Sequence, residues 1–182
     1  TGVQTCALPI LTDERTIHRL QASDADQMAR LRKEAITSAP LAFGSSPDDD
    51  RFSSTEAVHR VLTEGNQAIF GLFVGDRLQG MVGSYNSLTS KECHKVFIWG
   101  MYVCPRVRGQ GGGTQLLAAA VDWARNMPCV LQVHLSVTGS APEASRLYEK
   151  AGFVEWGVEP RALQWQGEFT VERHLVLFLP AQ

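Results

Sequence analysis

The sequence predicts an α/β fold in which helices flank a central mixed sheet that is mostly antiparallel. Short apolar segments of strand length alternate with segments whose apolar residues recur at helical spacing. Read in order, these segments give β-α-α-β-β-β-α-β-α-β-β. Because parallel strands need a long crossover connection, parallel pairing is expected only at the central β-α-β unit.

A single domain accounts for this pattern. The chain has 182 residues, 44% of them hydrophobic, and no repeat, low-complexity tract or long linker divides it. We assign residues 11–182 to this domain. Residues 1–10 begin without Met and show no periodicity that leads into the next segment. We therefore interpret residues 1–10 as a non-native or disordered segment.

The N-terminal third is predicted to contain one strand and two helices. Residues 16–20 alternate like a strand, and Ser23 is placed as the N-cap of a helix. The polar loop 40–50 follows, and then a second helix over residues 54–64, which opens with Ser-Ser-Thr-Glu. The apolar face of the first helix consists of Met28, Leu31, Ala35 and Ile36.

The middle of the chain reads as three strands. Residues 68–74 and 78–85 flank Gly75-Asp76-Arg77, which is typical of a hairpin turn. The strand over residues 95–103 contains Gly100, and a glycine inside a strand indicates a bulge or a close backbone approach.

The C-terminal half continues the alternation. The predicted elements are a helix over 112–126, a strand over 130–137, a helix over 142–150, and strands over 153–158 and 171–179. The first of these helices has a packing stripe of Leu116, Leu117, Ala120, Val121 and Ala124.

A glycine-rich turn connects the strand over 95–103 to the following helix. Glycine backbone can approach a phosphate closely, a helix N-terminus adds free N–H groups and positive dipole, and arginine adds charged donors. The turn therefore predicts a phosphate or pyrophosphate site formed by Arg106, Arg108, Gly109, Gln110, Gly111, Gly112, Gly113 and Thr114.

The spacing of the turn separates several classes of phosphate-binding loop. A P-loop needs Lys-Ser or Lys-Thr after its last glycine, and a dinucleotide fingerprint needs glycine where Thr114 stands. Neither pattern fits. The pattern Arg-x-x-Gly-x-Gly, from Arg108 to Gly113 and preceded by Val-x-Pro, resembles the acetyl-CoA-binding motif of the GCN5-related N-acetyltransferases (GNAT superfamily). The alternative is a surface loop that is glycine-rich by chance.

A second motif strengthens this resemblance. Residues 144–153 read ASRLYEKAGF, which is similar to the second GNAT signature, Ala-x-x-Leu-Tyr-x-Lys-x-Gly-Phe. Gly152 is also placed to end the helix before the next strand. The resemblance covers residues 15–179 and implies an acetyl-CoA-dependent enzyme that transfers an acetyl group directly to a primary amine in a ternary complex.

The resemblance also implies roles for particular residues. Tyr148 matches the tyrosine that commonly acts as a general acid near the thioester sulfur, and the alternative is a packed tyrosine with an incidental partner. The backbone N–H groups of Met101 and Val103 are expected to contact the oxyanion and the pantetheine arm. Ala141 stands where the family often has Asn, so Ser140 could supply part of that contact.

The general base is less well marked. Many members have a glutamate on the strand before the cofactor turn, but residues 95–103 contain no carboxylate. The candidates are Glu159 near the C-terminal strands and His134, which alternates with apolar neighbours and so faces away from them. A lone strand histidine is also compatible with a structural role.

Candidate acceptor residues lie in the loop between the first two helices. Asp48, Asp49 and Asp50 would attract a cationic amine such as an aminoglycoside or a polyamine, and the former would point to antibiotic resistance. A solvated acidic turn is the alternative. Two other functions stay open: a protein lysine or N-terminal acetyltransferase, and a noncatalytic acyl-CoA-binding sensor.

Composition excludes some partners. A net charge of −2 lacks the excess of basic residues that nucleic-acid binding requires, and no apolar run reaches membrane-spanning length. The cysteines show no metal-ligand spacing, so we expect no metal site and reduced thiols in a cytoplasmic protein. Cys104, beside the cofactor turn, is expected to be buried and inert. Assembly into a homodimer stays open.

Overall fold

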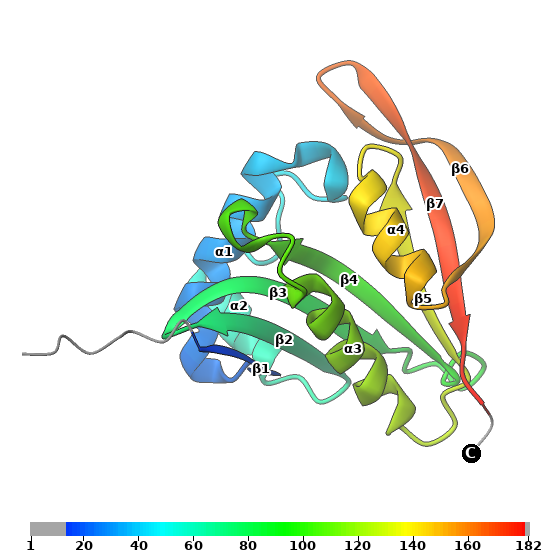
Figure 1. The fold of residues 1–182 in the computed structure, drawn as a ribbon, viewed down its shortest axis with the longest axis horizontal. Coiled ribbons are helices and arrows are strands. Elements are labelled where there is room, and N and C mark those ends of the chain that lie inside the picture. The colour runs from blue at the N-terminus through cyan, green and yellow to red at the C-terminus, as the bar shows by residue number, and fades with distance from the viewer. Residues whose placement is uncertain (1–13, 181–182) are drawn as a thin grey trace, which may run out of the picture.

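A seven-stranded mixed sheet with helices on both faces forms the structure, a computed structural model that describes residues 14–180 (Figure 1). This confirms the predicted fold class and order of elements. Residues 1–10, interpreted above as a separate segment, lie outside the described residues. The elements are β1 (Arg15–Arg19), α1 (Ala25–Ser38), α2 (Thr55–Leu62), β2 (Gln67–Val74), β3 (Arg77–Asn86), β4 (Lys95–Val103), α3 (Gly112–Arg125), β5 (Gln132–Thr138), α4 (Pro142–Lys150), β6 (Val154–Trp165) and β7 (Glu168–Phe178).

The strands are ordered β1-β2-β3-β4-β5-β7-β6. Within the described chain, β4 and β5 form the only parallel pair, and α3 connects them, as the β-α-β pattern predicted. Their ladder joins only residues 95–97 to residues 132–134. Beyond that point the two strands diverge, and Figure 1 shows the gap between their far ends. The C-terminal half of β4 therefore has no strand partner on its β5 side.

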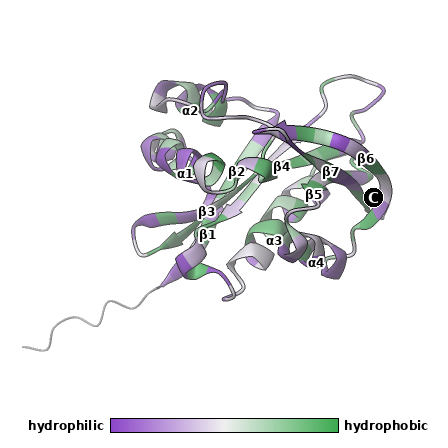
Figure 2. Ribbon diagram, turned by 90° about the horizontal axis from the view of Figure 1, so that it is seen from above, coloured by the Kyte–Doolittle hydropathy of each residue, from purple (hydrophilic) through white to green (hydrophobic). Residues whose placement is uncertain are grey.

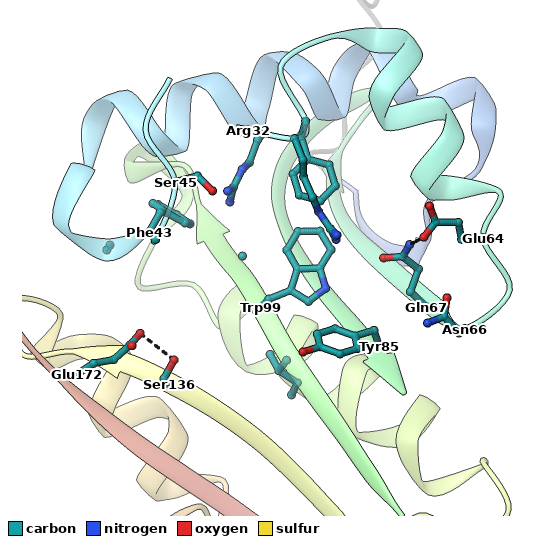
Figure 3. Close-up of a pocket in the computed structure, with 16 residues that line it drawn as sticks. Arg32, Phe43, Ser45, Glu64, Asn66, Gln67, Tyr85, Trp99, Ser136 and Glu172 are labelled. Carbon is teal, nitrogen blue, oxygen red and sulfur yellow. Dashed lines mark hydrogen bonds between the residues drawn. The ribbon is translucent and has the colours of Figure 1, made fainter. Parts of the chain in front are cut away.

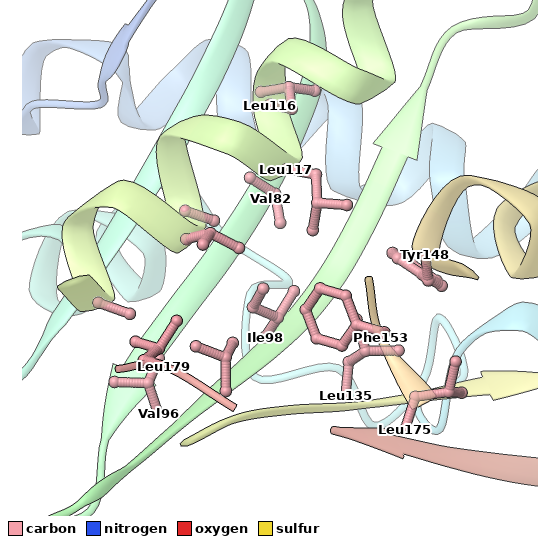
Figure 4. Close-up of a cluster of buried hydrophobic side chains, with 14 of the residues drawn as sticks. Val82, Val96, Ile98, Leu116, Leu117, Leu135, Tyr148, Phe153, Leu175 and Leu179 are labelled. Atoms are coloured by element: carbon pink, nitrogen blue, oxygen red, sulfur yellow. The ribbon is translucent and has the colours of Figure 1, made fainter. Parts of the chain in front are cut away.

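Two hydrophobic cores lie on opposite faces of the sheet. Figure 2 shows α1 and α2 on one side and α3 and α4 on the other. The larger core packs α3 and α4 onto the sheet, and the predicted stripe of α3 is fully buried in it (Figure 4). The apolar face predicted for α1 is buried against the sheet's other side, together with Val58 and Val61 of α2.

The start of α1 differs from the prediction. Ser23 is not the N-cap, because a 3₁₀ turn over Ala22–Asp24 precedes the helix. Instead, the carboxylate of Asp24 accepts a hydrogen bond from the backbone N–H of Gln21 at 2.8 Å. The predicted cap of α2 is confirmed, because Ser54 Oγ accepts from the N–H of Ala57 at 3.2 Å.

The last two strands are longer than the sequence pattern predicted. β6 and β7 form an extended hairpin whose turn places Gln166 and Gly167 at positive φ. Periodicity failed over residues 159–170 because both faces of this arm are largely exposed and the register shifts between Glu159 and Leu163. Glu172, which lies inside the strand predicted over residues 171–179, is paired with Thr138 of β5.

A buried ion pair joins α1 to the loop that precedes α2. The guanidinium of Arg32 donates to both carboxylate oxygens of Asp50 at 2.9–3.3 Å, and the two residues are only 5% and 6% exposed. The same guanidinium lies over the rings of Phe43 and Phe52, at 5.0 and 5.4 Å from their centroids. Arg32 therefore holds the loop over residues 39–54 through one ion pair and two contacts with aromatic rings.

We predict that Asp50→Ala lowers the free energy of unfolding by about 3–5 kcal/mol, because it leaves a buried guanidinium without its counter-charge. Urea denaturation monitored by tryptophan fluorescence measures this. The matched control is Asp48→Ala in the same loop, whose exposed side chain should change stability by less than about 0.5 kcal/mol. Equal effects of the two substitutions would contradict the importance of the pair.

Candidate cofactor and acceptor site

The glycine-rich turn is shaped to bind an anion. It leads into the N-terminus of α3, a helix of 14 residues, whose first N–H groups have no partner within the helix. Gly111, the N-cap, has φ = 82°, a left-handed conformation that costs a residue with a Cβ about 1–2 kcal/mol. No atom lies within 4 Å of the position that a Cβ would take at Gly109 or Gly111, so a ligand can reach the backbone.

Both predicted arginines lie at this turn, and each is held by one edge of its guanidinium. The Nε of Arg106 donates to Gln79 Oε1 at 2.7 Å, and the Nε of Arg108 donates to the carbonyl oxygen of Val103 at 2.8 Å. Both residues are exposed. They therefore place positive charge beside the turn, where a phosphate would be held.

The β4 strand bulges beside this turn. Gly100 has φ = 64°, and the register of β3 with β4 shifts between Met81 and Gly83. This confirms the bulge that the glycine indicated. Met101 and Val103 are half-buried and lie on the part of β4 that has no partner on β5. An extended ligand arm could pair with this free edge, so the residues present fit the cofactor that the motifs imply.

Tyr148 lies on α4 and is only 5% exposed. Its ring packs edge-on against Phe153, at 6.0 Å between centroids. Burial raises the pKa of the phenol, so Tyr148 stays protonated at neutral and moderately alkaline pH. A protonated phenol suits a proton donor, and its role as general acid stays a prediction.

The N-terminus of α4 lies on the β5 side of the gap. Ser140, just before it, is exposed, and its hydroxyl shares a hydrogen bond with Thr138 Oγ1 at 2.8 Å.

Cys104, which directly follows β4, is 1% exposed, and burial raises the pKa of its thiol to about 11. The predicted burial of Cys104 is confirmed, and its thiol stays protonated near neutral pH.

A cavity of about 470 Å³ opens on the α1–α2 face of the sheet (Figure 3). Its floor is β4, where Ile98, Trp99 and Gly100 line it. One wall comes from the loop over residues 42–52. The wall across the β4–β5 gap is formed by Ser136 of β5 and Glu172 of β7. The cavity therefore meets the gap at the bulge of β4.

The aromatic floor depends on a close approach of two strands. Trp99 lies flat across Gly83 of β3, where a Cβ would come within 2.1 Å of the indole ring. Phe52 stacks on the indole at 4.8 Å, and Tyr85 stacks on Phe97 at 5.2 Å. The lining combines a few aromatic residues with a larger share of polar and charged ones, among them Arg51, Glu64 and Glu172.

The polar wall of the cavity is centred on Glu172. Its Oε1 accepts a hydrogen bond from Ser136 Oγ at 2.8 Å. Behind it, His174 Nε2 lies 3.4 Å from Glu159 Oε2, and ligand atoms of the three residues all lie within 4.8 Å of one another. Sequence reasoning missed Glu172, because a single glutamate in an exposed strand gives no local signal.

The two predicted base candidates lie outside the cavity lining. Glu159 is on β6 behind Glu172, with a side chain that is 57% exposed. His134 does face away from its buried neighbours, as predicted, and its Nε2 lies 2.9 Å from Gln132 Oε1. Burial, with help from Lys95, lowers the pKa of His134 and keeps the ring neutral near pH 7.

The three aspartates do not form the expected acidic patch in the cavity. Asp50 is buried and its charge is used by Arg32, so it is not available to a substrate. Asp49 accepts a hydrogen bond from the backbone N–H of Ser46, and Asp48 is exposed. None of the three lines the cavity.

Among residues 14–180, no helix combines the length and the apolar character needed to cross a membrane. No curated protein matches the sequence.

Solved structures match the fold over nearly its whole length. A GNAT-family acetyltransferase from Streptococcus pneumoniae has a TM-score of 0.80 and 21% identity, over 91% of this chain and 100% of that one. A ribosomal-protein-alanine N-acetyltransferase from Brucella melitensis has a TM-score of 0.78 and 17% identity, over 90% and 99%. A putative acetyltransferase from Salmonella typhimurium, solved with its cofactor acetyl-CoA, has a TM-score of 0.77 and 17% identity, over 92% and 95%. The fold is that of the N-acetyltransferases.

The family follows from the sequence itself. The model of the acetyltransferase (GNAT) family matches residues 28–153, more than half of the chain. The chain belongs to the GNAT family of acetyltransferases.

The conformation of the turn gives a test of the cofactor site. We expect Gly111→Ala to weaken acetyl-CoA binding roughly 10-fold, because a Cβ disfavours the left-handed conformation by about 1–2 kcal/mol and the free turn would relax to a conformation that binding must reverse. Isothermal titration calorimetry measures the affinity. Gly157→Ala, which also meets no neighbouring atom, needs no positive φ and lies outside the cavity, is the matched control and should bind acetyl-CoA normally. Unchanged binding by Gly111→Ala would argue against this turn as the phosphate site.

Proposed function

We propose that this protein transfers an acetyl group from acetyl-CoA to the primary amine of a small molecule held in the cavity. The observation that supports this most directly is the meeting of two sites at one gap. The glycine-rich turn and the free edge of β4 lie on the donor side, and the cavity opens onto the same bulge from the α1–α2 face. An amine in the cavity would reach an acyl group threaded through the gap.

On the donor side, this chain supplies binding and orientation. The N–H groups of residues 109–113 and the charges of Arg106 and Arg108 would bind the pyrophosphate. The backbone of Met101 and Val103 would align the extended arm, and Ser140 would contact it from the β5 side. When bound, acetyl-CoA supplies the activated thioester. An N–H donor on β4 then stabilises the negative charge that develops on the thioester oxygen.

On the acceptor side, the amine must lose a proton before it can react. A simple alkyl ammonium has a pKa of about 10.4, so almost all of it is protonated at neutral pH. Glu172 is a carboxylate that lines the cavity at the gap, where Ser136 orients it. We assign Glu172 as the group that receives this proton, directly or through a water molecule. His174 and Glu159 behind it offer a path for the proton to the surface.

Tyr148 would donate its phenolic proton to the departing thiolate, and the second proton, which the nitrogen loses as the amide forms, would pass to solvent and restore the phenol. Its burial keeps it protonated until that step. His134 stands outside the cavity and is neutral, so it holds the aromatic sheet face between Phe97 and Trp156 rather than acting as the first proton acceptor.

The proposed function is tested by following CoA release from acetyl-CoA against small amines, polyamines, aminoglycosides, amino acids and peptides. We expect release that depends on a small-molecule acceptor, and a decrease in kcat of roughly 100-fold or more for Tyr148→Phe if proton donation limits the rate. Acetyl-CoA affinity should stay unchanged in this variant. Release with peptides alone would favour a protein acetyltransferase. Binding of acetyl-CoA without release across the panel would favour a noncatalytic sensor.

The assigned proton acceptor has its own signature in pH. We expect Glu172→Gln to lower kcat by roughly 100- to 10,000-fold near pH 7. The difference in kcat between Glu172→Gln and the unmodified protein should shrink toward about pH 9.5, because the unprotonated fraction of the amine rises as the pH approaches the pKa of the amine. Glu168→Gln, an exposed glutamate at the start of the same strand, is the control for charge. A deficit that is constant with pH would rule out proton acceptance by Glu172.

A further inference from the structure

The cavity contains two guanidinium groups with different surroundings. That of Arg32 is neutralised by Asp50 in a buried pair. That of Arg51, the next residue along the chain, forms no ion pair and no side-chain hydrogen bond with any residue in the range 14–180. Arg51 is therefore a positive charge in the cavity lining that no carboxylate among residues 14–180 pairs with.

The side chain of Arg51 is oriented by aromatic contacts. Its guanidinium lies over the ring of Phe52 at 4.6 Å and over the indole of Trp99 at 5.3 Å from the centroids. Stacking on a ring occupies the face of a guanidinium and leaves its N–H edges available, and these edges match the geometry of a carboxylate. The cavity therefore presents a positioned donor for an anionic group.

The opposite charge lies across the cavity. Glu172 is on the wall formed by β5 and β7, whereas Arg51 is on the loop wall beside α2. Glu64 is a second carboxylate in the lining, and it keeps its charge although it accepts a hydrogen bond from the neutral amide of Gln67. A cation and carboxylates on different walls are complementary to a molecule that has both charges.

We propose that the acceptor is a zwitterionic amino acid with an apolar side chain. Its α-ammonium faces Glu172 and Ser136, its carboxylate pairs with Arg51, and its side chain lies beside the lining residues Phe43 and Tyr85. This inference rests on the proposed function and narrows its substrate class. A polyamine or an aminoglycoside could face Glu64 and Glu172 but would offer no anion to Arg51.

Matched pairs of acceptors that differ only in the carboxylate test this proposal. The probes are L-phenylalanine with 2-phenylethylamine, and L-leucine with 3-methylbutylamine. We expect kcat/KM to be higher for each amino acid than for its amine. Because hydrogen bonds to a charged group contribute about 1.5–3 kcal/mol, Arg51→Gln should raise the KM of the amino acids roughly 10- to 100-fold. The substitution should leave the kcat of the amino acids, and both kcat and KM of the two amines, nearly unchanged.

Two controls separate this proposal from the function on which it rests. Arg60→Gln removes the same charge from an exposed position of α2 outside the cavity and should behave like the unmodified protein. Calorimetric binding of L-phenylalanine and L-leucine to the CoA-loaded protein is independent of turnover. Binding of either that Arg51→Gln weakens supports the zwitterion site even if no acetyl transfer occurs.

Three results would contradict the zwitterion proposal. Turnover of the amines that matches or exceeds turnover of the amino acids would overturn the zwitterion proposal and leave the acetyltransferase function intact. Equal losses for amines and amino acids in Arg51→Gln would do the same, because a general disturbance of the cavity would explain them. Absence of both binding and turnover with the two amino acids would also overturn it.

Discussion

The site depends on one constraint, the early end of the ladder between β4 and β5. Parallel pairing stops after Phe97 and His134, and the left-handed conformation of Gly100 then makes β4 bulge away from a regular ladder. The same break leaves backbone groups of β4 without a strand partner and opens the gap that both sides of the site share. A continuous parallel ladder would satisfy these groups and close the gap, so neither an extended cofactor arm nor an acceptor amine could reach it.

The acceptor side is stabilised by a second constraint, the environment of Arg32. A buried guanidinium is costly unless it is paired, and here Asp50 pairs with it while Phe43 and Phe52 cover its faces. These contacts order a loop that has little regular secondary structure. They also explain why neighbouring residues have different functions: Asp50 is used inside the protein, while Arg51 is left to face the cavity.

Sequence patterns predicted the fold well where the signal is local and repeated. The burial of Leu116 and its stripe on α3 follows from helical periodicity, and the end of α4 follows from Gly152, which has φ = 91°. The prediction was wrong at the start of α1. Ser23 was expected to be the N-cap, but it lies within a short 3₁₀ turn that precedes the helix. It was also incomplete over the β6–β7 arm, because strands exposed on both faces lack the alternation that marks a half-buried strand.

The sequence by itself determined the class of fold, the family and the glycine-rich turn, because the residues that specify such a turn before a helix are contiguous. Only the tertiary structure decided which residues line the cavity. Arg51, Ser136 and Glu172 are far apart along the chain, and they line one cavity because β5 pairs with β7 in a particular register. A shift of that register by one residue would turn Glu172 to the other face of the sheet. No local pattern in the sequence encodes that choice, since it depends on the packing of the whole sheet.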